Sequence, residues 1–276
     1  MRIAVYIGNK ELLREQRLLG LISELESQGC GCYVLEDGQS PDSETDMLLS
    51  VGGDGTFLSA SALAVGTGLP IAGVNLGRLG FLSENRPEDI ARSLPAGDYE
   101  IEDRTILKAD VSVRTAADFW PYALNEFTVH RSGAAMLGVD VSIDGVDLPA
   151  YWADGLIVST SSGSTAYSLS AGGPIVLPQS KVLIITPIAP HNLNIRPLVV
   201  PDTATVSLRV HSRDGKVILT ADNRTAEIKE GTEIEISVAQ FSLKRVRLNS
   251  SNFINALVEK LFWGEPLVQQ LAACYE

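Results

Sequence analysis

The first hundred residues alternate between short apolar runs and stretches with helical spacing. Residues 2–7, 32–35, 47–51 and 71–75 are apolar runs of strand length, and the run at 47–51 is typical of a strand buried in a parallel sheet. The segments between these runs have room for helices. This order of strand, helix and strand predicts a parallel sheet with helices on its faces.

Two of the intervening segments carry a helical signal. Leu18, Leu21, Ile22 and Leu25 recur at i, i+3, i+4 and i+7, which places them on one face of a helix. Residues 56–65 suit a second helix. We therefore expect the first hundred residues, 1–100, to form an α/β domain.

The pattern changes after about residue 100, where strand-like segments follow one another. Asp144-Gly145 and Asp214-Gly215 are turn signals between some of them. We expect residues 101–249 to form a mostly antiparallel, β-sandwich-like domain. The predicted strands are 106–113, 124–130, 139–143, 155–160, 182–186, 205–210, 217–220, 234–238 and 243–248.

An apolar stripe at helical spacing predicts one more helix within residues 250–276. Ser251 or Asn252 can cap its start, while Gly264 and Pro266 can end it. An amphipathic helix must cover apolar surface, so we expect this segment to pack back on the α/β domain.

Composition and charge narrow the class of protein. A chain of 276 residues is long enough for two domains, and its net charge of −12 makes the general surface repel a polyanion, so nucleic acid is not an expected partner. No apolar run of eighteen residues and no secretory signal is evident, and the three cysteines suit a reducing compartment. We therefore expect a cytoplasmic protein that is not bound to membranes. His130, His191 and His211 share no metal-ligand spacing, so no protein-held metal site is predicted.

The segment Gly52-Gly53-Asp54-Gly55-Thr56 lies where a buried strand meets a helix. Glycines let a phosphate approach the backbone closely, and a helix N-terminus offers free N–H groups to an anion. An aspartate among such donors is unusual for a pure anion site, which favours a general base or a ligand of a phosphate-bound metal. The alternative is an ordinary strand-to-helix turn in which Asp54 caps the helix.

Other nucleotide and hydrolase motifs are absent from the sequence. No Gly-x-Gly-x-x-Gly follows the first predicted strand, and no Gly-x-x-x-x-Gly-Lys-Ser/Thr loop occurs. Ser164 is not within a Gly-x-Ser-x-Gly elbow. A bound nucleoside triphosphate would therefore depend on the diglycine turn and Mg²⁺.

The glycine-rich turn resembles the signature shared by NAD kinases and diacylglycerol-type lipid kinases, and further segments resemble NAD kinases of the bacterial type. These segments cover nearly the whole chain in the family's order. They are Gly52-Gly53-Asp54-Gly55-Thr56, the runs from Asn75 to Leu82 and from Asp154 to Pro174, Asn125-Glu126, Pro190-His191, Arg196-Pro197 and Leu261-Phe262-Trp263-Gly264.

The resemblance implies an enzyme that transfers a phosphoryl group from ATP or another donor to the 2′-hydroxyl of the adenosine ribose of NAD, giving NADP, with help from Mg²⁺. Asp54 would be the general base. Glu126 would accept hydrogen bonds from ribose hydroxyls, Asn125 would contact the adenine end, and Asp154 would bind the nicotinamide carboxamide or its ribose.

The resemblance also implies a larger set of residues that bind the substrates. Thr165, Ala166 and Tyr167 would line the adenine pocket, and Ala189 would lie near the nicotinamide. The full predicted set is Gly52, Gly53, Asp54, Gly55, Thr56, Asn125, Glu126, Asp154, Ser162, Thr165, Ala166, Tyr167, Ser168, Leu169, Ser170, Ala189, Asp222 and Asn223.

Three positions depart from the family's pattern. Ser161 stands where proline is usual, and Trp152 stands where a basic residue is frequent. Asp222-Asn223 replaces a segment that usually contains glycine or histidine, and Asn tolerates the left-handed conformation almost as glycine does. The contacts expected of this last pair rest on the weakest match.

Two other functions fit parts of the sequence. A lipid kinase would need an apolar pocket for acyl chains, and the run at Thr165-Ala166-Tyr167 argues against it. A binding protein that senses NAD or NADP without turnover would use the same pocket, and the intact Asp54 argues against it. The resemblance further implies a homodimer or homotetramer, whereas the phosphoryl donor and the use of NADH stay open.

Overall fold

The computed structural model describes residues 1–36, 38–77, 79–112 and 119–263. The chain divides into two compact units. The first contains Met1–Glu102 and Lys244–Glu276, and the second contains Asp103–Leu243. None of the helices in the described part of the chain is long and apolar enough to cross a membrane.

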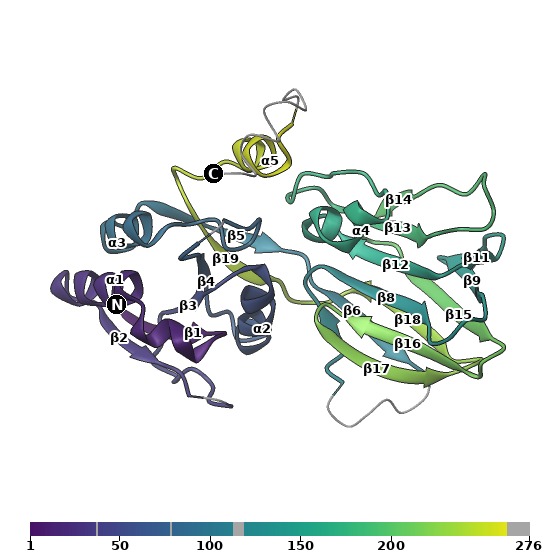
Figure 1. The fold of residues 1–276 in the computed structure, drawn as a ribbon, viewed down its shortest axis with the longest axis horizontal. Coiled ribbons are helices and arrows are strands. Elements are labelled where there is room, and N and C mark those ends of the chain that lie inside the picture. Colours follow the sequence, from purple (N-terminus) through teal and green to yellow (C-terminus); the bar gives the residue numbers. More distant parts are fainter. Residues whose placement is uncertain (37, 78, 113–118, 264–276) are drawn as a thin grey trace. The chain divides into compact units, whose positions relative to one another are not determined.

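The first unit is built on a six-stranded sheet whose first four strands are parallel (Figure 1). The wholly buried strand at its centre is the apolar run predicted from the sequence. In spatial order the strands are β2 (Gly31–Val34), β1 (Arg2–Ile7), β3 (Met47–Val51), β4 (Ile71–Val74), β19 (Leu243–Leu248) and β5 (Tyr99–Arg104).

Helices cover both faces of this sheet. Helices α1 (Gln16–Ser27) and α3 (Pro87–Ala96) pack with one face in a shared apolar core. Helix α2 (Asp54–Ala64) covers the other, where Phe57 lies so close to Gly73 of β4 that a β-carbon there would collide with its ring. A short 3-10 turn, η1 (Lys10–Arg14), precedes α1. Predicted residues Leu18, Leu21 and Leu25 are all buried, which confirms the amphipathic interpretation of α1.

Strand β19 lies in this sheet and not in the β-rich half where we expected residues 243–248. Arg245 of β19 pairs in parallel with Ile71 of β4. The alternation of side chains along a strand indicates which residues share a face, but it carries no information about which sheet the strand joins. The chain therefore returns to the first unit one strand earlier than expected.

The C-terminal helix α5 (Phe253–Leu261) belongs to the first unit. Asn252 caps it, because its Oδ1 accepts a hydrogen bond from the N–H of Ile254. The helix ends before Phe262, which has left-handed backbone angles. The predicted stop at Gly264 and Pro266 lies outside the described residues.

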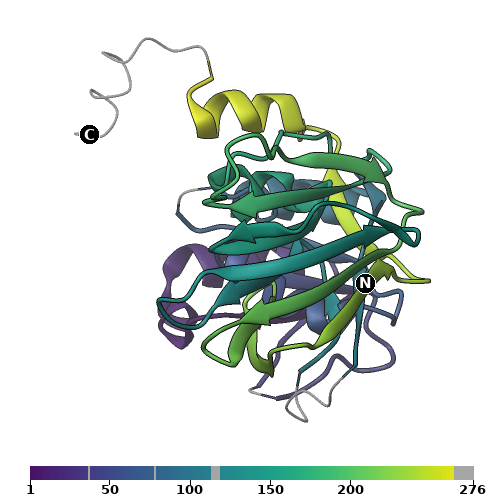
Figure 2. The ribbon, with the colours of Figure 1, turned by 90° about the vertical axis from the view of Figure 1, so that its right-hand side faces the viewer.

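The second unit consists of two antiparallel sheets that enclose a common apolar core (Figure 2). This confirms the β-sandwich-like prediction. One sheet contains β10 (Val146–Asp147), β9 (Leu137–Ile143), β15 (Val206–Ser212), β18 (Glu233–Val238), β6 (Leu107–Val111) and β7 (Tyr122–Ala123), with β11 (Tyr151–Ala153) paired to β9. The other contains β14 (Leu198–Pro201), β13 (Val182–Ile188), β12 (Gly155–Thr160), β8 (Glu126–Arg131), β16 (Lys216–Ala221) and β17 (Arg224–Lys229).

In the second unit, the two faces of the six-stranded sheet that contains β8 and β12 differ in polarity. Phe127, Val129, Leu156 and Val158 point into the core between the sheets. The alternate positions point to the opposite face and are largely polar. A 3-10 turn η2 (Ser162–Thr165) and a single helical turn α4 (Tyr167–Ser170) follow β12, and Ser168 hydrogen-bonds Thr186 on that opposite face.

Candidate functional site

The glycine-rich turn connects β3 to α2 in the first unit. Gly52 has a φ of +146°, which favours glycine, and a β-carbon there would collide with the side chain of Thr56. Gly53 is the N-cap residue of α2, and the helix begins at Asp54. The predicted residues of this turn therefore lie together at the carboxyl end of a central parallel strand, where α/β sheets bind ligands.

Asp54 is not the N-cap residue of its helix, because Gly53 occupies that position, and its side chain bonds to the 80–83 loop. Its Oδ2 accepts the N–H of Phe81 at 2.8 Å, and its Oδ1 accepts those of Leu82 and Ser83 at 3.0 and 2.9 Å. A β-carbon at Gly80 would overlap the carboxylate, so only glycine fits there. These contacts replace the helix-cap alternative with a carboxylate held by the 80–83 loop.

The two carboxylate oxygens of Asp54 are used unequally. Each ionised carboxylate oxygen has two lone-pair sites. Oδ1 fills both with the N–H groups of Leu82 and Ser83, whereas Oδ2 receives, among the described residues, that of Phe81 alone. Oδ2 is therefore the atom of Asp54 with capacity for one more proton donor.

A second set of predicted residues lies on the six-stranded sheet of the second unit. Glu126 is the first residue of β8 and Asn125 directly precedes it, and Asn125 and Glu126 are 6 % and 7 % exposed, respectively. The adjacent backbone is held by Asp222, whose carboxylate accepts the N–H groups of Leu124, Asn125 and Glu126 at 2.8, 2.8 and 3.2 Å. The buried carboxylate of Asp222 thus holds the backbone of the Asn-Glu pair in position.

Asp222 has a different place from the one expected of a binding residue. Its side chain is only 3 % exposed, and its backbone, not that of Asn223, is left-handed, with a φ of +51°. The pair forms the turn between β16 and β17, where Ala221 is opposite Arg224. Aspartate tolerates this conformation as asparagine does, and here its side chain is needed by the 124–126 backbone.

Glu126 and Asp222 are two buried acids near each other, and burial favours the protonated form of both. Burial and, to a smaller extent, the nearby charge of Asp222 together raise the pKa of Glu126 to about 8, against a backbone hydrogen bond from Tyr167 that lowers it. Burial also raises the pKa of Asp222, but three backbone N–H groups and Arg224 oppose that shift. We therefore assign the negative charge to Asp222 and a proton to Glu126 at neutral pH.

The segment that follows β12 brings further predicted residues to this face. A β-carbon at Gly163 would overlap the carbonyl oxygen of Asn125, which fixes η2 against the Asn-Glu pair. Tyr167 stacks on His130 with ring centroids 5.5 Å apart and an interplanar angle of 16°. Tyr167 as a residue is 38 % exposed, so it can offer a flat apolar surface to a ligand.

The other predicted residues occupy the ends and the rim of this segment. Asp154 pairs with Arg131, whose Nε lies 2.7 Å from Oδ1, so a basic neighbour is present although Trp152 replaces the usual one. Ala189 follows β13 and has a left-handed φ of +46°. The hydroxyl of Ser168 is used by Thr186, and that of Thr165 by the carbonyl of Ser162. Leu169 is half-buried, whereas Ser170 and Asn223 are exposed.

Four buried polar atoms near Asn125 and Glu126 have no hydrogen-bond partner within the described residues: Asn125 Oδ1, Glu126 Oε2, Thr128 Oγ1 and Ser159 Oγ. Ser159 lies opposite Glu126 on the neighbouring strand, and Thr128 is two residues further along β8, so these three share a face. Buried polar atoms are almost always paired, so this group fits a site for a polar ligand or ordered water. The sequence analysis did not select Thr128 and Ser159. The pairing of their strands could have indicated them, because it places both on the same face as Glu126.

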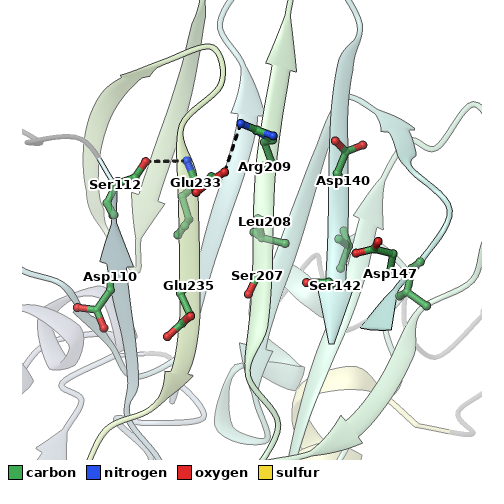
Figure 3. Close-up of a pocket in the computed structure, with 14 residues that line it drawn as sticks. Asp110, Ser112, Asp140, Ser142, Asp147, Ser207, Leu208, Arg209, Glu233 and Glu235 are labelled. Carbon is green, nitrogen blue, oxygen red and sulfur yellow. Dashed lines mark hydrogen bonds and ion pairs between the residues drawn. The ribbon is translucent and has the colours of Figure 1, made fainter. Parts of the chain in front are cut away.

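A hollow of about 720 Å³ lies elsewhere, on the outer face of the seven-stranded sheet (Figure 3). It contains none of the predicted site residues. Five carboxylates line it, and among the described residues of its lining the one cation is Arg209, which pairs with Glu233 at 3.3 Å. Carboxylates of this density repel phosphate groups, so the hollow does not suit a nucleotide. The five are Asp110, Asp140, Asp147, Glu233 and Glu235.

The fold and these sites define a two-unit kinase with a glycine-rich turn on an α/β unit and a polar ligand face on a β unit. Residues 26–97 match the family model of the ATP-NAD kinase N-terminal domain, and residues 124–248 match that of the C-terminal domain. The chain belongs to the NAD kinase family, whose members phosphorylate NAD to NADP, and it is an enzyme.

Individual relatives agree over most of the chain. It is 38 % identical over 264 residues to the NAD kinase of Flavobacterium psychrophilum, covering 94 % of this chain and 90 % of the relative. It is 41 % identical over 262 residues to that of Christiangramia forsetii, with 93 % and 89 % covered.

Solved structures show the same architecture. Yeast NADH kinase complexed with NADH has a TM-score of 0.81 at 25 % identity, covering 96 % of this chain and 88 % of that one. An NAD kinase from Archaeoglobus fulgidus in complex with ATP has a TM-score of 0.74 at 28 % identity, with 95 % and 98 % covered. The fold prediction is thereby confirmed.

Proposed function

We propose that this chain transfers the terminal phosphoryl group of ATP to the 2′-hydroxyl of the adenosine ribose of NAD, with Asp54 as the general base. The observation that carries this proposal is Asp54 Oδ2, which accepts one hydrogen bond from the described residues and has a lone-pair site for a second donor. Asp54 is the first residue of α2, and three backbone N–H groups of the 80–83 loop hold its carboxylate, so it has a defined orientation. A positioned base that removes the hydroxyl proton makes the ribose oxygen a better nucleophile.

The polar face of the second unit supports the proposal that NAD binds there. Glu126 and Asn125 supply the acceptors for ribose hydroxyls and the adenine edge, and each has a buried oxygen without a partner in the described residues. Tyr167 supplies a flat surface for a base. Asp154, paired with Arg131, and Ala189 would contact the nicotinamide end, as the family resemblance implies. Ser162 and the 165–170 segment would shape the pocket.

A coupled assay for NADP formed from NAD and Mg-ATP tests the reaction. Absence of turnover together with tight NAD binding would favour the sensor, and phosphorylation of diacylglycerol would favour the lipid kinase. Repeating the assay with NADH and with polyphosphate would define the acceptor and the donor. The cytoplasmic location and the homo-oligomer also stay predictions.

Mg²⁺ is proposed to reach the site on the donor phosphates. Within the described ranges, no group of three or more His, Cys, Asp or Glu side chains could hold a metal ion. Mg²⁺ keeps several waters and is bound in kinases through substrate phosphates and one or two carboxylates. When bound, the ion would neutralise the charge of the donor's phosphates.

Removal of divalent cations should therefore abolish turnover but spare NAD binding. After treatment with EDTA, NADP formation should fall to background and return when Mg²⁺ is added. The dissociation constant of NAD, measured by calorimetry, should stay the same because hydroxyl and base contacts need no metal. Full turnover in EDTA would contradict the role of the ion.

Binding of NAD should strengthen as the pH rises towards 8. The free protein holds a proton on Glu126, whose pKa is raised to about 8, and the ribose hydroxyls prefer the ionised acceptor. Below pH 8 the proton must leave on binding, so the dissociation constant should fall by at most about tenfold per pH unit and level off above pH 8.

Calorimetry in two buffers of different ionisation enthalpy measures the released proton directly. Glu126→Gln is the matched control, because the amide keeps the shape and does not titrate. This variant should bind NAD more weakly above pH 8 and show no pH dependence. A flat profile for the unmodified protein between pH 6 and 9 would disprove the assignment.

A further inference from the structure

Helix α5 contacts the same loop that holds Asp54. Nζ of Lys260 donates a hydrogen bond to the carbonyl oxygen of Gly80. The ammonium group also lies 4.5 Å from the centroid of the Phe81 ring. Phe253, at the start of α5, contacts the same ring, with the two ring centroids 6.1 Å apart. Phe253 and Lys260, near opposite ends of α5, therefore contact the loop at Gly80 and Phe81.

The 80–83 loop is a single closed turn with Lys260 on one side and Asp54 on the other. The N–H of Gly80 donates to the carbonyl oxygen of Ser83 at 3.0 Å, which closes the turn. Its carbonyl faces the ammonium group, and its next three N–H groups face the carboxylate. A cation on the carbonyl polarises the adjoining peptide group and strengthens its N–H as a donor.

The charges around Lys260 leave the loop as its specific partner. Of the acids that raise the pKa of Lys260, Glu84 acts most strongly, but it is paired with the buried Arg245, whose Nη2 lies 2.7 Å from its Oε1. Burial lowers the pKa of the Lys260 ammonium, while Glu84, Asp54 and Glu259 raise it and Arg245 lowers it. Since Arg245 already neutralises Glu84, the main directed contact of Lys260 is the Gly80 carbonyl.

We propose that Lys260 is a positioning residue for phosphoryl transfer: it fixes the 80–83 loop and, through the loop's N–H groups, the orientation of Asp54 Oδ2. The C-terminal helix thereby helps to position the base, although Lys260 and Asp54 are far apart in the sequence. This inference rests on the proposed role of Asp54 as the base.

Lys260→Met tests the inference because it keeps the apolar stem over Phe81 but removes the donor and the charge. We expect kcat for NADP formation to fall by about 10- to 100-fold, since small displacements of a catalytic group have effects of this size. The dissociation constant of NAD and the unfolding temperature should change little. Lys260→Arg, which keeps a cationic donor, should recover most of the lost rate.

A matched control and a second variant separate positioning from general damage. Lys216→Met removes a lysine that pairs with Glu227 on a strand of the second unit, and it should leave kcat unchanged. If Lys260→Met does not fold, Lys260→Gln takes its place. The glutamine side chain is one bond shorter than that of lysine, so its amide nitrogen should not reach the Gly80 carbonyl, and this variant should show the same loss.

A double-mutant cycle with Asp54→Asn decides whether Lys260 acts through the base. In the Asp54→Asn background, Lys260→Met should cost no further rate. An unchanged kcat in Lys260→Met, or an equal further loss in the Asp54→Asn background, would overturn the inference. Near-normal turnover of Asp54→Asn alone would disprove the base, and any loss in Lys260→Met would then also refute action through it.

Discussion

Asp54→Asn should lower turnover of NAD to NADP by about 10²–10⁴-fold, the range that a positioned general base contributes. The amide has the same shape but cannot take up a proton at neutral pH. The dissociation constant of NAD should change little, because the proposed NAD contacts lie on the second unit. Steady-state NADP formation and NAD titration on the same variant measure the two quantities.

The loop contacts of Asp54 call for a specific control. Asn keeps one acceptor oxygen for the N–H groups of Leu82 and Ser83, but its amide nitrogen cannot accept that of Phe81. Part of the rate loss therefore comes from a loosened loop. Lys260→Met loosens the loop while the carboxylate remains, so its smaller loss measures that part. Turnover close to normal in Asp54→Asn would remove Asp54 from the chemistry.

Asp222→Ala should destabilise the second unit by about 3–5 kcal/mol, as expected when a buried charged partner is lost. Three N–H groups, of Leu124, Asn125 and Glu126, would lose their acceptor, and each bond to a carboxylate contributes about 1.5–3 kcal/mol. NAD affinity should fall as well, because the Asn-Glu pair loses its support. Chemical denaturation and NAD titration measure both effects.

Two variants frame this prediction. Asp214→Ala removes another turn aspartate, one that is exposed and accepts the N–H of Ala135 at 3.1 Å, and it should cost no more than about 1 kcal/mol. Asp222→Asn keeps one acceptor oxygen and removes the charge that raises the pKa of Glu126. The pH at which NAD binding levels off should therefore move down. Unchanged stability in Asp222→Ala would contradict the supporting role.

The periodicity of the chain predicted most of the secondary structure. Helix α1, strand β3 and the antiparallel unit were all expected, because burial on one or two faces leaves a direct record in the order of apolar residues. Helix α3 was missed, although Pro87 stands at its first position, and so were β5, β14 and β17. Strands β5, β14 and β17 lie at sheet edges, where exposed positions weaken the alternation.

The sequence determined by itself the glycine-rich turn, the Asn-Glu pair and the family to which the chain belongs, since each is a local run of residues. Only the tertiary structure decided what these residues touch. Asp54 is held by N–H groups 27 to 29 residues away, the Asn-Glu backbone by a carboxylate 96 to 98 residues away, and Gly80 by a lysine 180 residues away. Such contacts join side chains to backbone groups, and every residue except proline has the same N–H and C=O. A sequence therefore shows which side chains can donate or accept a bond, whereas the folded chain selects the backbone group that pairs with each of them.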